Sequence, residues 1–376
     1  MLPQGVLGFQ YEAERSSTGV TSLAGLPLYL DLVHSSGLAA VIRQHVQVAG
    51  RQGWLDIQSV LAVVLLNLAG GDRVDDLERL EGDSGFAAVL QAIERDLLSR
   101  SERRSLASRW RRERERTVPS PSALSAWLER FHDPEMPKAV AGAAFIPVVT
   151  EALQGLWQVN QVLLGFIQQH QPVAAATLDM DATLIETHKR DALHCYKGFE
   201  AYQPLNCWWA ERGAMLYSEF RDGNVPAGHE QLRVLQDSLR HLPANVTKVS
   251  LRSDTAGYQE ELLLYCGEAK DPRFGVIEFA IGADVTEAFR AAVLATVEME
   301  WKPLIRMVDD KPQQTDQEWA EVATCRIGPG TAAIGRTTGS WRSVNRCANC
   351  HWATRRNCRS RRRSLPARAP TSCSAW

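Results

Sequence analysis

The sequence predicts an α/β protein in which a helical N-terminal region precedes a mixed sheet flanked by helices. Before about residue 135, apolar residues recur with the helical period. From Ala174 onward, short stretches rich in β-branched and aromatic residues alternate with helical stretches. The chain of 376 residues also has room for two or three domains, because single cores usually split beyond roughly 250–300 residues.

The N-terminal region is expected to consist of several helices. Residues 59–71, SVLAVVLLNLAGG, predict a buried helix that ends at a glycine pair. Ser122 is the expected cap of a helix in SALSAWLERFH, and a long apolar helix is expected over residues 145–168. The Arg-rich segment 100–116 is either a DNA-backbone contact or a solvated helix face. We favour the helix face, because the segment also contains Glu residues three or four positions from Arg.

The second half begins with three expected strands, in ATLDMDATLIE, YKGFEAYQPLNCWW and AMLYSEFRDG. The last two are joined by the turn at residues 211–213, which is far shorter than the crossover of a dozen or more residues that a parallel pair needs. Antiparallel pairing is therefore expected. A helix, a strand, a helix, a strand and a helix should follow, over residues 230–242, 247–251, 259–266, 274–281 and 286–297.

Charge is distributed unevenly along the chain. All 44 acidic residues lie at or before Glu321, so residues 1–321 carry a net charge of −13 and residues 322–376 carry +11. The Arg- and Cys-rich tail shows no helical or strand period, and we expect it to be disordered. It is either a basic arm that contacts phosphates or a segment translated out of frame, and its composition favours the second.

The tail also contains a possible zinc motif. Cys347 and Cys350 form a CxxC, with His351 and Cys358 nearby. A second paired motif is missing, so zinc binding is not expected. The longest apolar run, residues 60–66, is far shorter than the ~18 residues that span a bilayer, and the N-terminus does not resemble a secretory signal. We therefore expect a cytoplasmic protein without a membrane partner.

Three aspartates are the strongest candidates for catalysis. Asp179 and Asp181 lie two residues apart on one expected strand, so their side chains share a face at about 6–7 Å. On a central strand such acids need a metal ion, a proton or a cation, whereas on an edge strand both would be solvated. Asp254 follows another strand, at the end where catalytic groups of open α/β sheets collect. Paired with Asp181, it would form half of a divalent-metal site.

One family resemblance comes from LDMDATLI, which is similar to the first motif of haloacid-dehalogenase-like phosphatases. It implies Asp179 as the nucleophile and Asp181 as the acid/base of a Mg-dependent phosphatase, with Asp309 and Asp310 as an acidic pair. That fold needs a helical crossover after its first strand, whereas residues 196–222 predict an antiparallel hairpin. The phosphatase is therefore the alternative.

The chain more closely resembles the DDE transposases of bacterial insertion sequences. The motifs that carry this resemblance are, in order, GGDRVDDLERL, PSPSALSAWLERFH, LDMDATLIETHK, YKGFEAYQPL, EFRDGNVPAG and LRSDTAGYQ. The resemblance implies a helical region that binds the element ends (1–135), an RNase H-like catalytic core (136–321) and the tail (322–376).

The resemblance also implies a catalytic site. Asp181 and Asp254 would be the first two acids of the triad and would bind Mg²⁺ or Mn²⁺. Asp179 is the alternative for the first acid and a further metal ligand. The third acid should be a Glu on a later helix. Glu298 and Glu300 come too early, and no acid follows Glu321. We therefore expect little or no activity, and a third possibility is a catalytically dead protein that binds element ends.

DNA is the implied partner, as terminal inverted repeats and as target DNA, bound by a homodimer that holds two ends together. Because residues 1–321 are acidic overall, local patches must provide the binding. Tyr202 and Trp208 are candidates to stack on a splayed base. The expected phosphate contacts are Lys189, Arg190, Lys197, Arg221 and Arg252.

Overall fold

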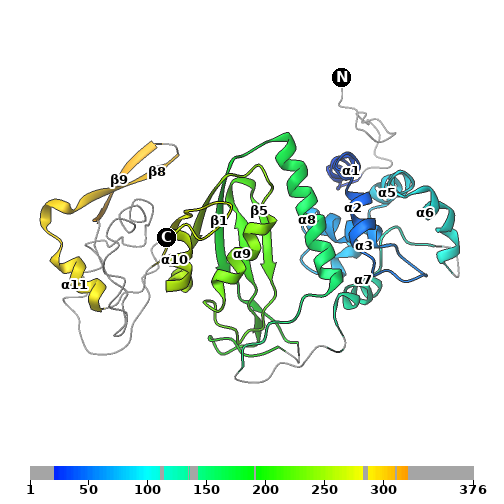
Figure 1. Cartoon of the computed structure of the whole chain (residues 1–376). Coiled ribbons are helices and arrows are strands. Elements are labelled where there is room, and N and C mark those ends of the chain that lie inside the picture. Colours follow the sequence, from blue (N-terminus) through cyan, green and yellow to red (C-terminus); the bar gives the residue numbers. More distant parts are fainter. Residues whose placement is uncertain are drawn as a thin grey trace. The chain divides into compact units, whose positions relative to one another are not determined.

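The computed structural model describes residues 21–110, 114–133, 135, 143–189, 192–282, 287–309 and 311–320 (Figure 1). The chain divides into two compact units. The first, Met1–Lys138 with Pro147–Pro172, is helical, and the second, Ala139–Ile146 with Val173–Trp376, contains the main sheet. The predicted class, an α/β protein with a helical N-terminal part, is confirmed. The predicted tail, including the CxxC and its neighbours, lies outside the described residues.

The helical unit surrounds one apolar core, in which Leu30, Ile42 and Leu77 are fully buried. Helix α3 matches the buried helix predicted from SVLAVVLLNLAGG. The helices are α1 (Leu26–Ser35), α2 (Leu38–His45), α3 (Asp56–Leu68), α4 (Leu77–Gly82), α5 (Ser84–Leu97), α6 (Arg100–Ser105), α7 (Pro121–Leu128) and α8 (Glu151–His170). No helix in the described ranges is long and apolar enough to cross a membrane.

The start of α7 corrects one expectation. Ser120, and not Ser122, caps this helix, because its hydroxyl accepts a hydrogen bond from the backbone N–H three residues on, at 3.3 Å. Pro121 occupies the first helical position, where its fixed φ fits and its missing N–H costs nothing. The residue before the proline is therefore the cap.

The Arg-rich segment ties the helical unit together. Arg114 forms two hydrogen bonds of 2.6 Å with Glu94 of α5, and Glu102 pairs with Arg43 of α2 at 2.6 Å. Arg109 donates to backbone carbonyls of the loop at residues 50–54. The described residues of the segment are thus ion-paired, but not in the predicted way, because these partners come from other elements and not from the next helical turn.

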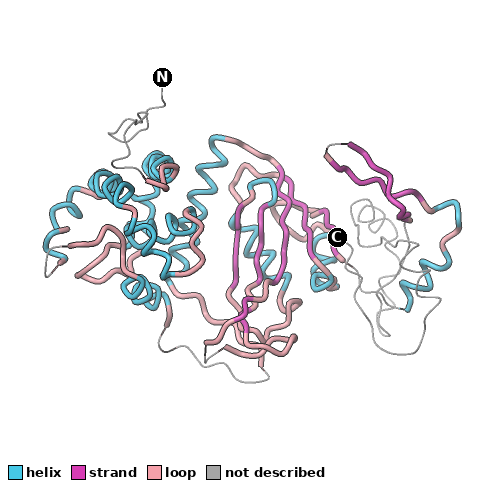
Figure 2. The backbone as a smooth tube through the Cα atoms, turned by 180° about the vertical axis from the view of Figure 1, so that it is seen from behind, coloured by secondary structure: helices cyan, strands magenta, loops and turns pink. Residues whose placement is uncertain are grey.

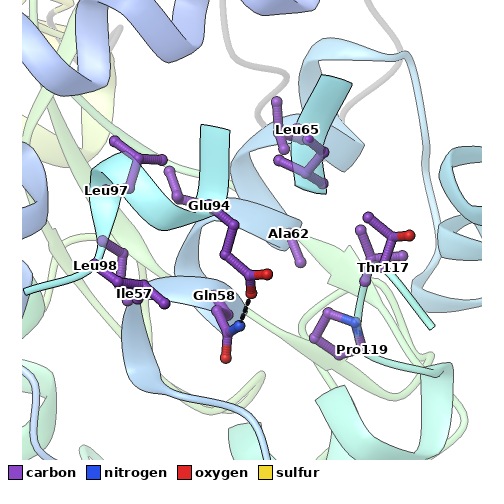
Figure 3. A pocket seen from close by; sticks show the side chains of 12 residues that line it. Ile57, Gln58, Ala62, Leu65, Glu94, Leu97, Leu98, Thr117 and Pro119 are labelled. Atoms are coloured by element: carbon purple, nitrogen blue, oxygen red, sulfur yellow. Dashed lines mark hydrogen bonds between the residues drawn. The ribbon is translucent and has the colours of Figure 1, made fainter. Parts of the chain in front are cut away.

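A small cavity of about 30 Å³ lies in this helical core (Figure 3). Its wall is mostly apolar, with Ile57, Leu65 and Leu97 among the lining residues. The polar lining residues are Gln58, Glu94 and Thr117. Glu94 accepts a hydrogen bond from Gln58, as Figure 3 shows, and is also paired with Arg114, while Thr117 accepts a hydrogen bond from Gln91 at 3.0 Å. The polar groups are thus satisfied by each other, and the cavity is a packing gap.

The second unit contains a five-stranded sheet with the order β5-β4-β1-β6-β7. Figure 2 draws the strands in magenta. Its strands are β1 (Ala175–Ala182), β4 (Leu205–Trp209), β5 (Ala214–Glu219), β6 (Lys248–Ser253) and β7 (Glu278–Ile281). Strand β4 pairs antiparallel with both β1 and β5, whereas β6 pairs parallel with both β1 and β7. Three antiparallel strands followed by two parallel ones give the expected RNase H-like mixed sheet.

The remaining elements of this unit are the helices α9 (Gln231–His241), α10 (Glu260–Gly267) and α11 (Glu287–Ala295) and two short hairpins. The hairpins pair β2 (Ile185–Glu186) with β3 (Ala201–Tyr202) and β8 (Lys302–Val308) with β9 (Lys311–Trp319). Helix α9 covers one face of β4 and β5 (Figure 1). On the covered face of the sheet, Leu178, Met180 and Leu251 are at most 1% exposed.

Helix α8 belongs to the helical unit, although we predicted a boundary near residue 135. The reason is a close approach between α8 and the end of α2. A Cβ atom on Gly155 would lie 1.9 Å from the carbonyl oxygen of His45. Only a residue without a side chain allows this packing.

Two alanine substitutions in α8 should have opposite effects. We expect Gly155→Ala to lower the free energy of unfolding by about 2 kcal/mol or more, because the methyl group overlaps backbone. Gly165→Ala meets nothing within 4 Å and should raise it by about 0.5–1 kcal/mol. Urea unfolding of both variants tests this. Equal effects would contradict the packing described for α8.

Candidate active site

The register of β1 and β6 brings the predicted acids together. The two strands run parallel, with Asp179 opposite Arg252 and Met180 opposite Ser253. The next residues along the same direction are Asp181 and Asp254, at the carboxyl ends of neighbouring strands. Groups at this end of adjacent parallel strands share one edge of the sheet. The structure thus places these two acids side by side.

The electrostatics of the pair favour a bound cation. Partial desolvation and the neighbouring charge of Asp254 raise the pKa of Asp181, although the residue as a whole is exposed. Asp254 is oriented by its own turn, because its Oδ1 accepts a hydrogen bond of 2.9 Å from the backbone N–H of Ala256. Two adjacent carboxylates offer the hard oxygen ligands that Mg²⁺ and Mn²⁺ prefer. The donor set therefore fits a divalent metal.

The described residues do not complete a larger metal cluster. Within those ranges, no group of three or more His, Cys, Asp or Glu side chains is placed to hold a metal ion. Glu298 and Glu300 belong to a short helical turn just before β8. Asp310, one half of the acidic pair of the phosphatase hypothesis, lies outside the described residues.

Asp179 is already paired. Its two carboxylate oxygens accept hydrogen bonds from Nε and Nη2 of Arg252, the second at 2.5 Å. These hydrogen bonds raise the pKa of Arg252 above its ordinary value. Because the guanidinium neutralises the carboxylate, the structure does not support Asp179 as a metal ligand or as a nucleophile.

The carboxylate of Glu211 lies on the same face of the sheet, further from the acid pair. Burial by itself would raise the pKa of Glu211, but hydrogen bonds from Thr177 lower it. They come from Thr177 Oγ1 at 2.6 Å and from its backbone N–H at 2.8 Å. Glu211 is thus held by the start of β1, away from the carboxyl end of that strand.

Arg221 is not a phosphate contact. Its side chain is 1% exposed and forms a 2.8 Å ion pair with Glu219, while Nη1 donates to the carbonyl of His229 at 2.7 Å. A buried guanidinium cannot reach DNA at the surface. Arg221 instead supports the turn that leads to α9, where Arg233 also pairs with Glu219 at 2.6 Å.

Four other predicted DNA contacts lie in the loop between β2 and β3, in β3 and in β4. Lys189 and Lys197 are exposed, and the amine of Lys197 lies 5.7 Å from the ring centroid of Tyr196. The ring of Tyr202 packs against Phe220 at 4.7 Å, which leaves it less accessible than Trp208, at 39% exposed. Arg190 lies outside the described residues.

Sequence reasoning missed the residue that anchors this loop. Asp222 is 4% exposed, and its Oδ1 accepts hydrogen bonds from the backbone N–H of Leu193 at 2.9 Å and of Gly223 at 2.7 Å. Gly223 fits tightly, since a Cβ there would lie 2.3 Å from the carbonyl oxygen of Ala201. The Asp-Gly pair in RDGN was the available signal, because such pairs mark turns.

A mixed sheet that presents two carboxylates at the ends of neighbouring strands defines a candidate for metal-dependent phosphoryl transfer. The profile of the family described as "Transposase DDE domain group 1" matches residues 8–323. The chain therefore belongs to this family of transposases.

Two further comparisons add little. No functionally curated protein matches the sequence. Among solved structures, the Drosophila P element transposase strand transfer complex matches with 12% identity and a TM-score of 0.22, over 66% of this chain and 49% of that chain. The chain thus spans about half the length of that relative, and similarity this low does not define a shared fold.

The repulsion between the acids has a measurable consequence. A raised pKa means that the folded state binds the proton of Asp181 more tightly than the unfolded state does. Stability is therefore lost as pH rises from near 3.8 through the raised value. We expect Asp181→Asn to raise the free energy of unfolding at neutral pH without metal, by no more than about 1 kcal/mol because the site is exposed to solvent. The gain should vanish in acid.

Thermal unfolding in EDTA at two pH values measures this effect. Glu211→Gln is the matched control, since the pKa of Glu211 is lowered and its loss should destabilise the fold at neutral pH. A lower stability of Asp181→Asn at neutral pH would contradict the described repulsion.

Proposed function

We propose that the chain is a transposase of the type that carries out metal-dependent cleavage and transfer of DNA strands at the ends of an insertion sequence, with little activity of its own because a third acid does not join Asp181 and Asp254 among the described residues. The in-register placement of Asp181 beside Asp254 carries this proposal, together with membership of the transposase family. Asp181 and Asp254 would hold Mg²⁺ or Mn²⁺ between the carboxyl ends of β1 and β6. A bound metal ion activates the attacking hydroxyl group and stabilises the leaving oxygen of an in-line phosphoryl transfer.

The residues of this chain position both the metal and the DNA. The hydrogen bond from Ala256 fixes the carboxylate of Asp254, and the sheet fixes the backbone of Asp181. The loop that Asp222 anchors lies between β2 and β3 and carries the exposed Lys189 and Lys197. We propose that these lysines contact the phosphates that flank the cut.

The phosphatase alternative is less well supported. Its nucleophile would be Asp179, which is neutralised by Arg252. Strand β1 is also followed by the antiparallel β4 and not by a helical crossover to a parallel strand. Incubation with Mn²⁺ and either labelled element ends or a phosphomonoester separates the two functions. Phosphate release that is lost in Asp179→Ala, without cutting of DNA, would contradict the transposase proposal.

Metal binding tests the acid pair directly. We expect Asp181→Asn and Asp254→Asn each to weaken Mn²⁺ binding by about tenfold or more, since each removes a ligand charge. Calorimetry or electron paramagnetic resonance of Mn²⁺ titrations measures the affinity. Glu211→Gln keeps both acids and should bind as the unmodified chain does. Unchanged affinity in either Asp variant would refute a shared metal.

The loop lysines should contribute through charge. Lys189→Ala and Lys197→Ala should each reduce the slope of log affinity against log salt by about one, because one phosphate contact is lost. Fluorescence anisotropy with a labelled DNA duplex measures this slope. Lys270→Ala is the control, because Lys270 pairs with Glu268 at 3.1 Å in the segment before β7. An equal change in all three variants would point to a general charge effect.

A further inference from the structure

We propose that Asp179 is a positioning residue that holds Arg252 against the DNA phosphate to be cut. This inference rests on the proposed function, and it gives Asp179 a role other than metal ligand or nucleophile. The paired side chains lie two residues before the acid pair along the same strands, Asp179 before Asp181 and Arg252 before Asp254. Residues two apart on a strand share a face at about 6–7 Å, so the ion pair lies on the same face of the sheet as the acid pair and next to it along both strands.

The form of the pairing leaves the guanidinium able to bind a further group. Asp179 uses Nε and Nη2 of Arg252, which accounts for two of five N–H donors. The Nη1 amine forms no hydrogen bond within the described part of the chain. The side chains of Arg252 and Asp179 are 42% and 35% exposed, so solvent and ligands can reach them. A planar fork with free donors suits the tetrahedral oxygens of a phosphate.

The pairing also serves to pre-organise the arginine. A free Arg side chain loses much rotamer freedom when it binds, and a carboxylate that already fixes the guanidinium removes part of this cost. Trp208, on the neighbouring strand β4, lies opposite Asp179 in the sheet register and borders the pair on its other side. Arg252 is therefore oriented before DNA arrives.

A second ion pair on the same strand provides an internal comparison. Lys248 of β6 pairs with Glu278 of β7 at 3.1 Å. Lys248 is four residues before Arg252 and shares its face, but it lies six residues, or roughly 20 Å along the chain, from Asp254 of the acid pair. Both pairs combine one cation with one anion, and only the first lies beside Asp181 and Asp254.

Removing the negative charge of Asp179 should weaken the binding of DNA, which is the opposite of what charge alone predicts. By charge alone, removing an acid should strengthen binding to DNA. If Asp179 acts by holding Arg252, Asp179→Ala should instead weaken binding, by about fivefold to tenfold. Asp179→Asn keeps one hydrogen-bond acceptor, so its affinity for DNA should lie between that of Asp179→Ala and that of the unmodified chain. In an Arg252→Ala background, Asp179→Ala should cause no further loss.

The experiment measures the affinity of the full chain for a fluorescein-labelled DNA duplex in Ca²⁺, by anisotropy, for both single variants and the double variant. Glu278→Ala is the matched control and should bind DNA as well as or better than the unmodified chain. Thermal unfolding identifies any variant that has lost its fold. If Asp179→Ala does not fold, Asp179→Asn takes its place in the experiment.

Tighter binding by Asp179→Ala, or equal losses from Asp179→Ala with and without Arg252, would overturn the positioning role. In that case the acid pair and its metal would still stand on the Mn²⁺ titrations. Absence of any DNA binding by the unmodified chain would overturn both this inference and the proposed function.

Discussion

The parallel pairing of β1 with β6 is the constraint on which the candidate site depends. Its register sets Asp179 opposite Arg252 and carries Asp181 to a position beside Asp254. A slip of one residue would turn these acids toward the covered face, where Leu178 and Met180 now lie. The apolar residues that alternate with the acids therefore enforce the geometry of the site, because burial of two carboxylates in their place would be very costly.

The two pairs across these strands have opposite electrostatic characters. Asp179 and Arg252 neutralise each other, whereas Asp181 and Asp254 repel each other and carry negative charge that a divalent cation can neutralise. The two pairs are two residues apart along each strand, so a cation-binding pair of acids follows a fixed guanidinium. The anionic phosphate of DNA would meet positive charge from both, which is the arrangement that phosphoryl transfer requires.

Much of this arrangement follows from local sequence pattern. The alternation in ATLDMDATLIE and the short turn near Gly213 predict the antiparallel strands, and the position of Asp254 after a strand predicts its meeting with Asp181. These inferences succeed because strand period and turn length are local properties.

The errors have a common physical cause. Arg221 was predicted as a surface phosphate contact, but it is buried against Glu219, and the ion pair between Arg252 and Asp179 was not predicted. A side chain's partner is set by tertiary neighbours that sequence spacing does not reveal. The same holds for α8, whose place in the helical unit depends on the contact of Gly155 with α2.

The central claim is that Asp181 and Asp254 bind one divalent cation while Asp179 remains with Arg252. A crystal of the chain soaked in Mn²⁺, with anomalous diffraction recorded at a wavelength that reveals manganese, tests this most directly. We predict an anomalous peak contacted by the carboxylates of Asp181 and Asp254, with the Asp179–Arg252 pair intact. A peak coordinated by Asp179, or no peak at the ends of β1 and β6, would contradict it.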